Sequence, residues 1–247
     1  TFHWATNYGA ILQAFALQTY LKNLGYEVSI INYRPKQYKK TLFKSFFIRR
    51  FWLFISKLKE YSKEQKLEKF RVKFLNETLI YDSLNELKSN PPNFDVYICG
   101  SDQIWNPSFT TMGEGKPTPA YFLDFGNDQV KRIAYAVSFG CEVYPEKATN
   151  IARKYVPKFD AVSVREDSGI EIASKLGFNN PTKLPDPTLL LVPDNYSFTS
   201  SDKTPNQKKA FVYILRNKYK ENKDILSDLK RSFNIITVDK VFNPISV

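Results

Sequence analysis

Apolar residues recur along this chain with two alternating periods, and the alternation predicts a succession of helices and strands. Over Ala10–Leu24 they recur every three or four positions, which is typical of a helix with one buried face, and Gly25 is its expected C-terminal cap. Residues 27–33 then alternate as a strand that ends before Pro35. With Thr1–His3 as the last residues of an earlier strand, this segment predicts a β-α-β unit with parallel strands.

The same alternation continues as far as residue 192. Residues 41–78 contain no Gly or Pro, so one or two helices are expected there. The period of the apolar residues predicts strands at 95–99, 132–138, 161–165 and 182–184, and helices at 144–156 and 167–176. Apolar strands that alternate with helices are typical of a doubly wound, Rossmann-like α/β domain with a parallel sheet.

A change to polar composition after residue 192 predicts a domain boundary. Residues 193–209 hold two prolines and a cluster of Ser and Thr, which is typical of a linker. A strand, a helix and a strand are then predicted at 210–215, 220–232 and 234–238. We therefore expect a first domain at 1–192, with a basic aromatic helical insertion at about 36–78. A linker at 193–209 then leads to the start of a second Rossmann-like domain at 210–247. We interpret the sequence as a piece of a longer protein, in which this second domain is truncated.

The formal net charge of +11 is concentrated in one segment. Residues 36–73 hold 13 Lys and Arg against three Glu, interspersed with Phe and Trp. Three interpretations are open: a helix with one core face and one solvated basic face, which is the commonest arrangement, an interfacial helix on anionic membrane lipid, or a nucleic-acid patch. No known nucleic-acid motif accompanies the charge, so we expect no nucleic-acid partner.

The two cysteines and the single histidine limit the chemistry that the chain supports. Cys99 and Cys141 lie in or beside apolar runs and are expected to be reduced, which predicts a cytoplasmic protein. No Cys or His cluster has the spacing of metal ligands, and no run of about 18 uncharged apolar residues predicts a transmembrane helix.

The most distinctive stretch is Gly100–Pro107, which follows the predicted strand at 95–99. A strand that runs into Gly-Ser-Asp places backbone amides and a carboxylate at the carboxyl end of a sheet, where ligands bind in open α/β folds. Asp102 is interpreted as a group that positions a sugar hydroxyl or acts as a base, or equally as a helix N-cap. Trp105 is interpreted as a wall for a substrate or as a lid packed on the domain.

Polar residues also follow the other predicted strands. Asn7-Tyr8-Gly9 opens the first helix, and its free amides either attract an anion or form a plain capping turn. Arg165 ends a strand, where its guanidinium either binds a carboxylate or phosphate or forms a salt bridge with a nearby acid. Ser138 closes another strand, and Asp186 lies between two prolines in a turn that aims it into a cleft or only reverses the chain.

Four pieces of the sequence, in this order, together resemble the polysaccharide pyruvyl transferase family. They are Asn7–Leu17, Gly100–Pro107, Ser163–Glu166 and Asp186–Leu190, and the second contributes most. The resemblance implies a glycosyltransferase-B-like fold of two Rossmann-like domains. It also implies a transferase that needs no cofactor and uses phosphoenolpyruvate as its donor. Such an enzyme moves the enolpyruvyl carbon onto hydroxyls of a glycan or lipid-linked sugar of the bacterial surface. The products are a pyruvate ketal and phosphate.

The resemblance also suggests roles for the polar residues. Asp102 and Arg165 are expected in catalysis. The expected substrate-binding residues are Asn7, Tyr8, Gly9, Gln13, Gly100, Ser101, Gln103, Trp105, Asn106, Ser138 and Asp186. Family members carry a histidine in their second half, whereas this sequence has none after His3, so we expect the general acid to lie outside it and the fragment alone to be inactive. Lipid-linked sugars would place the enzyme at the inner face of the plasma membrane.

Two other interpretations of the function are open. A nucleotide-sugar glycosyltransferase has a similar fold, and a non-catalytic basic adaptor at the membrane would use the α/β domain only as a scaffold. Fold alone does not separate these classes, because unrelated functions share such folds.

Overall fold

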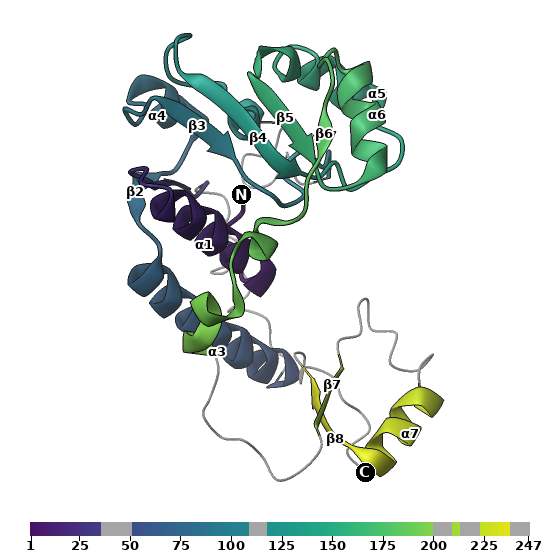
Figure 1. The fold of residues 1–247 in the computed structure, drawn as a ribbon. Coiled ribbons are helices and arrows are strands. Elements are labelled where there is room, and N and C mark those ends of the chain that lie inside the picture. Colours follow the sequence, from purple (N-terminus) through teal and green to yellow (C-terminus); the bar gives the residue numbers. More distant parts are fainter. Residues whose placement is uncertain (36–50, 109–117, 200–208, 213–222, 238–247) are drawn as a thin grey trace. The chain divides into compact units, whose positions relative to one another are not determined.

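The computed structural model describes residues 1–35, 51–108, 118–199, 209–212 and 223–237 (Figure 1). The chain divides into two compact units, Thr1–Val192 and Pro193–Val247. Within the described residues, no helix is long and apolar enough to cross a membrane.

Helices and parallel strands alternate along the first unit. The α-helices are α1 (Tyr8–Asn23), α3 (Phe51–Phe74), α4 (Leu84–Ser89), α5 (Glu146–Ala152) and α6 (Asp167–Lys175). The strands are β1 (Ile30–Tyr33), β2 (Glu77–Tyr81), β3 (Val96–Cys99), β4 (Lys131–Val137), β5 (Ala161–Val164) and β6 (Thr182–Lys183). Short 3-10 helices lie at η2 (Pro119–Phe122), η3 (Val156–Lys158) and η4 (Pro187–Leu190). These elements form the Rossmann-like α/β arrangement that the sequence predicts.

The strands of the first unit form two parallel sheets. Strand β1 pairs with β2, and the second sheet has the order β3-β4-β5-β6, whose strands lie side by side in Figure 1. In the second sheet, Cys99 is paired with Ala134, and Val164 with both Val137 and Lys183. Because the strands are parallel, their carboxyl ends lie along one edge, and the loops that follow them are brought together.

Strand β4 is irregular just before its carboxyl end. Its register with β5 shifts between Ala134 and Val137, and Ala136 has a φ of 46°, a conformation that residues other than glycine rarely adopt. The buried Ser163 hydroxyl accepts a hydrogen bond from the Ala136 amide (2.8 Å) and donates one to the Ala134 carbonyl (3.1 Å). These bonds replace the ladder bonds that the irregularity removes, so the end of β4 keeps a defined shape.

Helix α3 packs on α1 and fixes the segment that leads into it. The ring of Phe15 on α1 contacts Phe70 and Phe74 on α3 edge-on. Arg71 is 0% exposed, and its guanidinium donates hydrogen bonds to the carbonyls of residues 3, 4 and 5 (2.9, 3.1 and 3.2 Å) and to the carboxylates of Glu64 and Glu68. A buried charge is tolerated when it is paired and hydrogen-bonded in this way.

The basic segment is described only from residue 51 onward. Over its last turns Leu67 and Arg71 are buried, whereas Lys66, Lys69 and Lys73 are exposed. This half of the segment therefore has one core face and one solvated basic face. Residues 36–50 lie outside the described residues, and contact with a membrane stays a prediction.

Within the described residues, the predicted elements are confirmed in type, with ends that differ by a few residues, except for one strand. The parts predicted at 213–215, 220–222 and 238 lie outside the described residues. The helix predicted to reach residue 78 ends at Phe74, and β2 follows it after two residues. The side-chain amide of Gln18 explains the end of the helix, because it donates to the Phe74 carbonyl (2.9 Å) and accepts from the Asn76 amide (2.7 Å). Thr1–His3, predicted to end a strand, is not in a strand here.

The second unit repeats the β-α-β pattern on a smaller scale. It contains η5 (Pro193–Thr199), β7 (Lys209–Val212), α7 (Lys223–Ser232) and β8 (Asn234–Thr237). Strands β7 and β8 are parallel and in register, as expected for strands joined by a helix. Residues 193–199, predicted as linker, form a 3-10 helix.

Candidate active site

Four loops meet at the carboxyl edge of the β3-β4-β5-β6 sheet. The Ser138 amide after β4 donates to the Asp102 carbonyl after β3 (3.0 Å), and the Arg165 amide after β5 donates to the carbonyl of Val137 (3.1 Å). The Ser101 hydroxyl donates to Asp186 Oδ2 beyond β6 (2.9 Å). Residues that are up to 85 positions apart in the sequence therefore form one polar cluster.

The turn after β3 is strained and internally hydrogen-bonded. Asp102 has a φ of 144°, which residues other than glycine rarely adopt, and it forms an isolated parallel bridge with Val137. Its carboxylate accepts the Gln103 amide (2.8 Å), and the Asn106 side-chain amide donates to Gln103 Oε1 (2.8 Å). Asp102 Oδ1 thus accepts a bond within its own turn, and no helix of the described chain begins there for the side chain to cap.

Glycine is required at position 140 because two turns cross there. Gly140 has a φ of 63°, and a Cβ at this position would meet Asn106 Nδ2 and lie 2.7 Å from Gln103 Oε1. An L-residue would therefore be strained and would also displace the polar side chains of the turn after β3.

Arg165 and Asp186 form the charged part of the cluster. Arg165 Nη1 lies 3.3 Å from Asp186 Oδ2, and Asp186 Oδ1 accepts hydrogen bonds from the Thr188 amide (3.0 Å) and hydroxyl (2.8 Å). Burial opposes ionisation of Asp186, but the bonds from Thr188 and Ser101 and the charge of Arg165 outweigh it, so the pKa of this carboxyl lies below its ordinary value. The Arg165 side chain is 36% exposed, so it is partly accessible from solution.

Glu166 holds the loop after β4, and the sequence analysis assigned it no role. Its Oε1 accepts hydrogen bonds from the Ser138 hydroxyl (2.8 Å) and the Phe139 amide (3.0 Å), and the Ser138 hydroxyl in turn accepts the Gly140 amide (3.1 Å). Two residues that adjoin in the sequence therefore have separate tasks: Arg165 pairs with the loop after β6, and Glu166 fixes the loop after β4.

Helix α1 approaches the edge through its middle. A Cβ placed on Gly100 would lie 3.3 Å from the Leu17 side chain and 3.8 Å from Gln13 Oε1, so the turn after β3 passes close beneath the helix. Gln13 is buried, and its side chain also donates to the Thr1 hydroxyl. The predicted site residues Gln13 and Gly100 are thus neighbours.

The start of α1 makes its contacts elsewhere. Asn7 is the N-cap of α1, and its side chain accepts the Gly9 amide (2.9 Å), as in the plain capping interpretation. The Tyr8 ring lies beneath the Lys63 ammonium group of α3, 4.8 Å from the ring centroid. The contacts described for Asn7–Gly9 are therefore to its own turn and to α3, and an anion site shared with Arg165 stays a prediction.

Comparison with known proteins gives one match, to a protein-family model described as polysaccharide pyruvyl transferase, and it covers residues 7–243. The chain belongs to the polysaccharide pyruvyl transferase family. Neither a curated protein nor a solved structure matches the chain. The family match spans both compact units and confirms the resemblance recognised in the sequence.

Membership of this family makes the chain an enzyme of pyruvyl transfer in polysaccharide biosynthesis, with a polysaccharide acceptor. The match therefore favours pyruvyl transfer over a nucleotide-sugar glycosyltransferase and over a non-catalytic adaptor. Within the described part of the chain, no group of three or more His, Cys, Asp or Glu side chains is arranged to hold a metal ion.

The structure of this pyruvyl transferase corrects the role expected of Trp105. The side chain is 0% exposed, stacks on Phe122 and contacts Phe139 and Phe159, and its Nε1 donates to the Tyr121 carbonyl (3.0 Å). Here the indole is part of the core and has no free face for a sugar. Its burial anchors the polar turn to the domain, which is the second of the two sequence interpretations.

His3, the single histidine of the chain, is buried and is not available as a proton donor. It is 1% exposed, and its Nε2 lies 3.4 Å from a carboxylate oxygen of Glu77. Burial lowers the pKa of His3 to about 3, so the imidazole is neutral at physiological pH.

Proposed function

We propose that this pyruvyl transferase uses phosphoenolpyruvate as its donor and binds it at the carboxyl edge of the sheet, around Arg165. The donor carries a carboxylate and a phosphate, and both favour fixed cations and oriented donors. Arg165 is the observation that carries the proposal, because Asp186 fixes its position at the edge while its side chain stays 36% exposed.

The proposed reaction joins one donor to two hydroxyls of an acceptor sugar. A proton adds to the methylene carbon of the enol, the adjacent carbon takes on oxocarbenium character, and a sugar hydroxyl attacks it. The bond from this carbon to the phosphate oxygen then breaks, and the second hydroxyl closes the cyclic ketal. The two sugar hydroxyls each lose a proton. One of these protons replaces the proton that was added to form the methyl group, and the other leaves with phosphate. We propose that the acceptor belongs to a surface polysaccharide or its lipid-linked precursor.

The residues of the edge have distinct roles in this proposal. Arg165 binds the anionic groups of the donor, whereas Ser101 and Ser138 are buried and hold Asp186 and Glu166 in place through their hydroxyls. The Asp102 carboxylate positions a sugar hydroxyl or accepts its proton, and its strained backbone and its bond to Gln103 hold it in one orientation. Gln103 and Asn106 hold the shape of the turn, and Asp186 orients Arg165.

Binding calorimetry with phosphoenolpyruvate tests the proposal. Loss of a desolvated charge-assisted contact costs about 2–5 kcal/mol, so the Arg165→Ala variant should bind phosphoenolpyruvate at least about 30-fold more weakly. Arg153→Ala, which removes an exposed arginine at the end of α5, is the matched control and should bind as the wild type does. Equal binding by Arg165→Ala and the wild type would reject the site, and stabilisation by a nucleotide sugar alone would favour glycosyl transfer.

A further inference from the structure

His3 and Glu77 face each other across a short gap in the interior of the first unit. His3 Nε2 lies 3.4 Å from Glu77 Oε1. Both atoms are buried, and neither has a hydrogen-bond partner in the described part of the chain. A buried polar atom without a partner is costly, and two unprotonated acceptors that face each other also repel. One proton between the two atoms would satisfy both of them.

The other oxygen of Glu77 already serves as an acceptor. Oε2 accepts hydrogen bonds from Asn32 Nδ2 (2.8 Å) and Arg34 Nη2 (3.1 Å). Arg34 Nε in turn donates to Asn32 Oδ1 (2.6 Å), so the carboxyl group of Glu77 has a fixed orientation. In a protonated carboxyl group one oxygen carries the O–H and the other accepts. A proton on Glu77 therefore lies on Oε1, the oxygen that faces the ring.

The charges linked to Glu77 leave room for one proton. Arg34 pairs with Glu77 and Glu68, and Arg71 pairs with Glu64 and Glu68. With every carboxyl ionised, the cluster holds two guanidinium charges against three carboxylate charges. Glu77 has the least exposed side chain of the three acids, so a proton there balances the cluster where charge is most costly. Burial raises the pKa of Glu77, with Arg34 opposing, Glu68 adding to the rise and Arg71 opposing.

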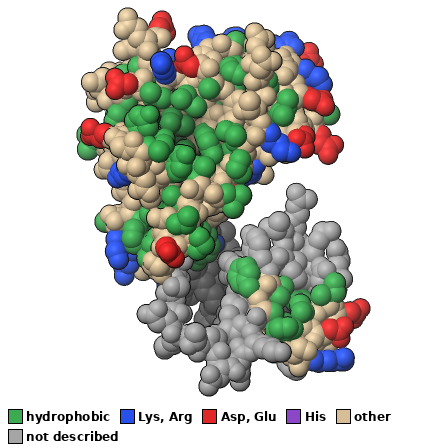
Figure 2. All heavy atoms as spheres, in the orientation of Figure 1, with side chains coloured by type: hydrophobic (Ala, Val, Ile, Leu, Met, Phe, Trp, Pro, Cys, Tyr) green, Lys and Arg blue, Asp and Glu red, His purple; other side chains and the backbone are tan. Residues whose placement is uncertain are grey.

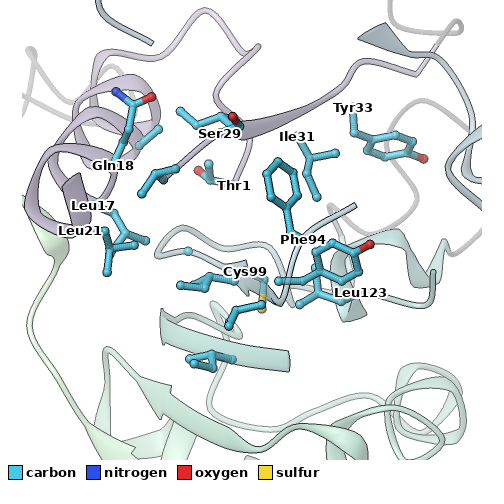
Figure 3. Close-up of a pocket in the computed structure, with 18 of the residues that line it drawn as sticks. Thr1, Leu17, Gln18, Leu21, Ser29, Ile31, Tyr33, Phe94, Cys99 and Leu123 are labelled. Carbon is cyan, nitrogen blue, oxygen red and sulfur yellow. The ribbon is translucent and has the colours of Figure 1, made fainter. Parts of the chain in front are cut away.

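The surroundings of His3 are largely apolar. The ring is 1% exposed and lines a cavity of about 670 Å³, whose walls include Ile31 and Tyr33, labelled in Figure 3. Hydrophobic side chains also gather on the face of the first unit that Figure 2 shows. Such surroundings disfavour a charged imidazole.

Charged groups near the ring act in the same direction. Burial lowers the pKa of His3 most, and the amino group of Thr1 and the guanidinium of Arg34 lower it further. The Asn32 side chain and the Thr1 backbone oppose this effect only in part. The imidazole is therefore neutral, and Nε2 can accept a hydrogen bond.

We propose that Glu77 carries a proton on Oε1 and donates a hydrogen bond to His3 Nε2, and that loss of this proton as the pH rises loosens the cluster. The bond joins β2 to the segment that leads into α1. Arg71 holds the carbonyls of residues 3, 4 and 5 in the same segment. Without the proton, a carboxylate faces the lone pair of a neutral ring, so one of the contacts that hold the segment becomes repulsive. The inference is independent of the proposed donor and of pyruvyl transfer.

The direction of the pH dependence follows from Glu77. Its pKa in the folded chain is raised, so its stabilisation is fully present below the unfolded pKa of about 4.3 and is lost as the pH rises through the folded value. The Glu77→Gln variant removes this titration and keeps the contacts. Its side-chain oxygen can accept from Asn32 and Arg34, and its NH₂ group can donate to His3 Nε2 at every pH.

Nitrogen-15 NMR of the imidazole tests the proposal directly, because the chain contains a single histidine. Between about pH 5 and 8, where an ordinary histidine titrates, we expect a neutral ring with its proton on Nδ1 and none on Nε2. The Nε2 shift of the wild type should move once, as Glu77 loses its proton, and should stay constant in Glu77→Gln. Glu27→Gln, at an exposed position of the same unit, is the control and should titrate as the wild type does.

Urea unfolding over the same pH range gives a second measurement. The unfolding constant of the wild type, divided by that of Glu77→Gln, should rise with pH. The rise is about tenfold for each unit by which the folded pKa of Glu77 exceeds the unfolded one. A ratio that does not change with pH would contradict the proposal.

Three NMR outcomes would also overturn it. A proton on Nε2 throughout the range would show that the imidazole donates to an ionised Glu77. A doubly protonated ring would show an ion pair. Equal movement of the Nε2 shift in the wild type and in Glu77→Gln would assign the titration to another group. The first two outcomes are read from the wild type alone, so they decide the question even if the variant does not fold.

Discussion

Replacing Asp186 by Asn removes one negative charge from the active-site edge while keeping the shape of the side chain. Asp186 Oδ1 accepts the two bonds from Thr188, and Oδ2 accepts Ser101 and faces Arg165 at 3.3 Å. Asn caps a helix about as well as Asp, so we expect its oxygen to keep the Thr188 bonds. Its NH₂ group then faces Ser101 and Arg165, and this group can neither accept the hydrogen bond from Ser101 nor pair with the Arg165 charge.

The magnitude follows from the contacts that are lost. A hydrogen bond to a charged group contributes about 1.5–3 kcal/mol to stability, and a partly exposed ion pair adds about 0.2–1 kcal/mol. We therefore expect the free energy of unfolding to fall by about 2 kcal/mol, which for a chain of this size lowers Tm by about 4–8 °C. The Asp128→Asn variant is the control, because Asp128 is exposed on a turn of the same unit.

The pH dependence separates charge from shape. The pKa of Asp186 in the folded chain lies below its ordinary value, so its stabilisation is fully present above the unfolded pKa of about 3.9 and is lost as the pH falls through the folded value. Urea unfolding at a series of pH values should show the difference between wild type and Asp186→Asn at its largest near pH 7 and shrinking below about pH 4. A difference that stays constant on acidification would refute the assignment to the carboxylate charge.

The remaining predictions concern backbone, core and surface. Gly140→Ala should destabilise the chain by about 1–3 kcal/mol more than Gly25→Ala, because both glycines have positive φ but only position 140 lacks room for a Cβ; equal losses in urea melts would contradict the crossing of the turns. Arg71→Met should lower the free energy of unfolding by about 3–5 kcal/mol in the same assay, whereas Lys69→Met on the exposed face of α3 should lower it by less than about 0.5 kcal/mol. Similar values for the two variants would show that Arg71 does not stabilise the fold. Residues 36–73 should bind anionic lipid vesicles at low salt and release them at high salt in sedimentation assays, and no binding at low salt would remove the membrane contact.

The sequence predicted the strands and the polar cluster at their carboxyl ends, because both can be recognised from residues that are close together in the chain. The apolar run before Gly100 predicted β3, and the polar residues after it predicted a site at the carboxyl end of the sheet. Such signals need only the period of the side chains and the rule that parallel strands share an edge. For this reason Ser101, Ser138, Arg165 and Asp186 were named from sequence and lie together in the structure.

Features that depend on distant partners were not predictable in this way. Helix α3 ends and strand β2 begins where the side chain of Gln18 accepts a hydrogen bond from the Asn76 amide, and the two residues are 58 positions apart. Trp105 lies within a polar turn, yet Phe122 and Phe159 cover it from elements that follow later in the chain. Neither partner is visible in a local window, and tertiary packing overrides the local pattern at both positions.

Two of the four positive-φ residues other than glycine in the described chain lie where the chemistry is proposed, and the other two, Leu123 and Asn180, lie elsewhere. Asp102, Ala136 and Gly140 all have φ in the positive range, and all three lie at or beside the carboxyl ends of β3 and β4. Strain at a residue other than glycine costs about 1–3 kcal/mol, and it persists only when the surrounding contacts fix it. Here the Ser163 hydroxyl and the Gln103 amide make those contacts, and Glu166 holds the loop that follows β4. A stable sheet needs none of these conformations, and residues held in such conformations cluster at functional sites, which supports the ligand site proposed at this edge.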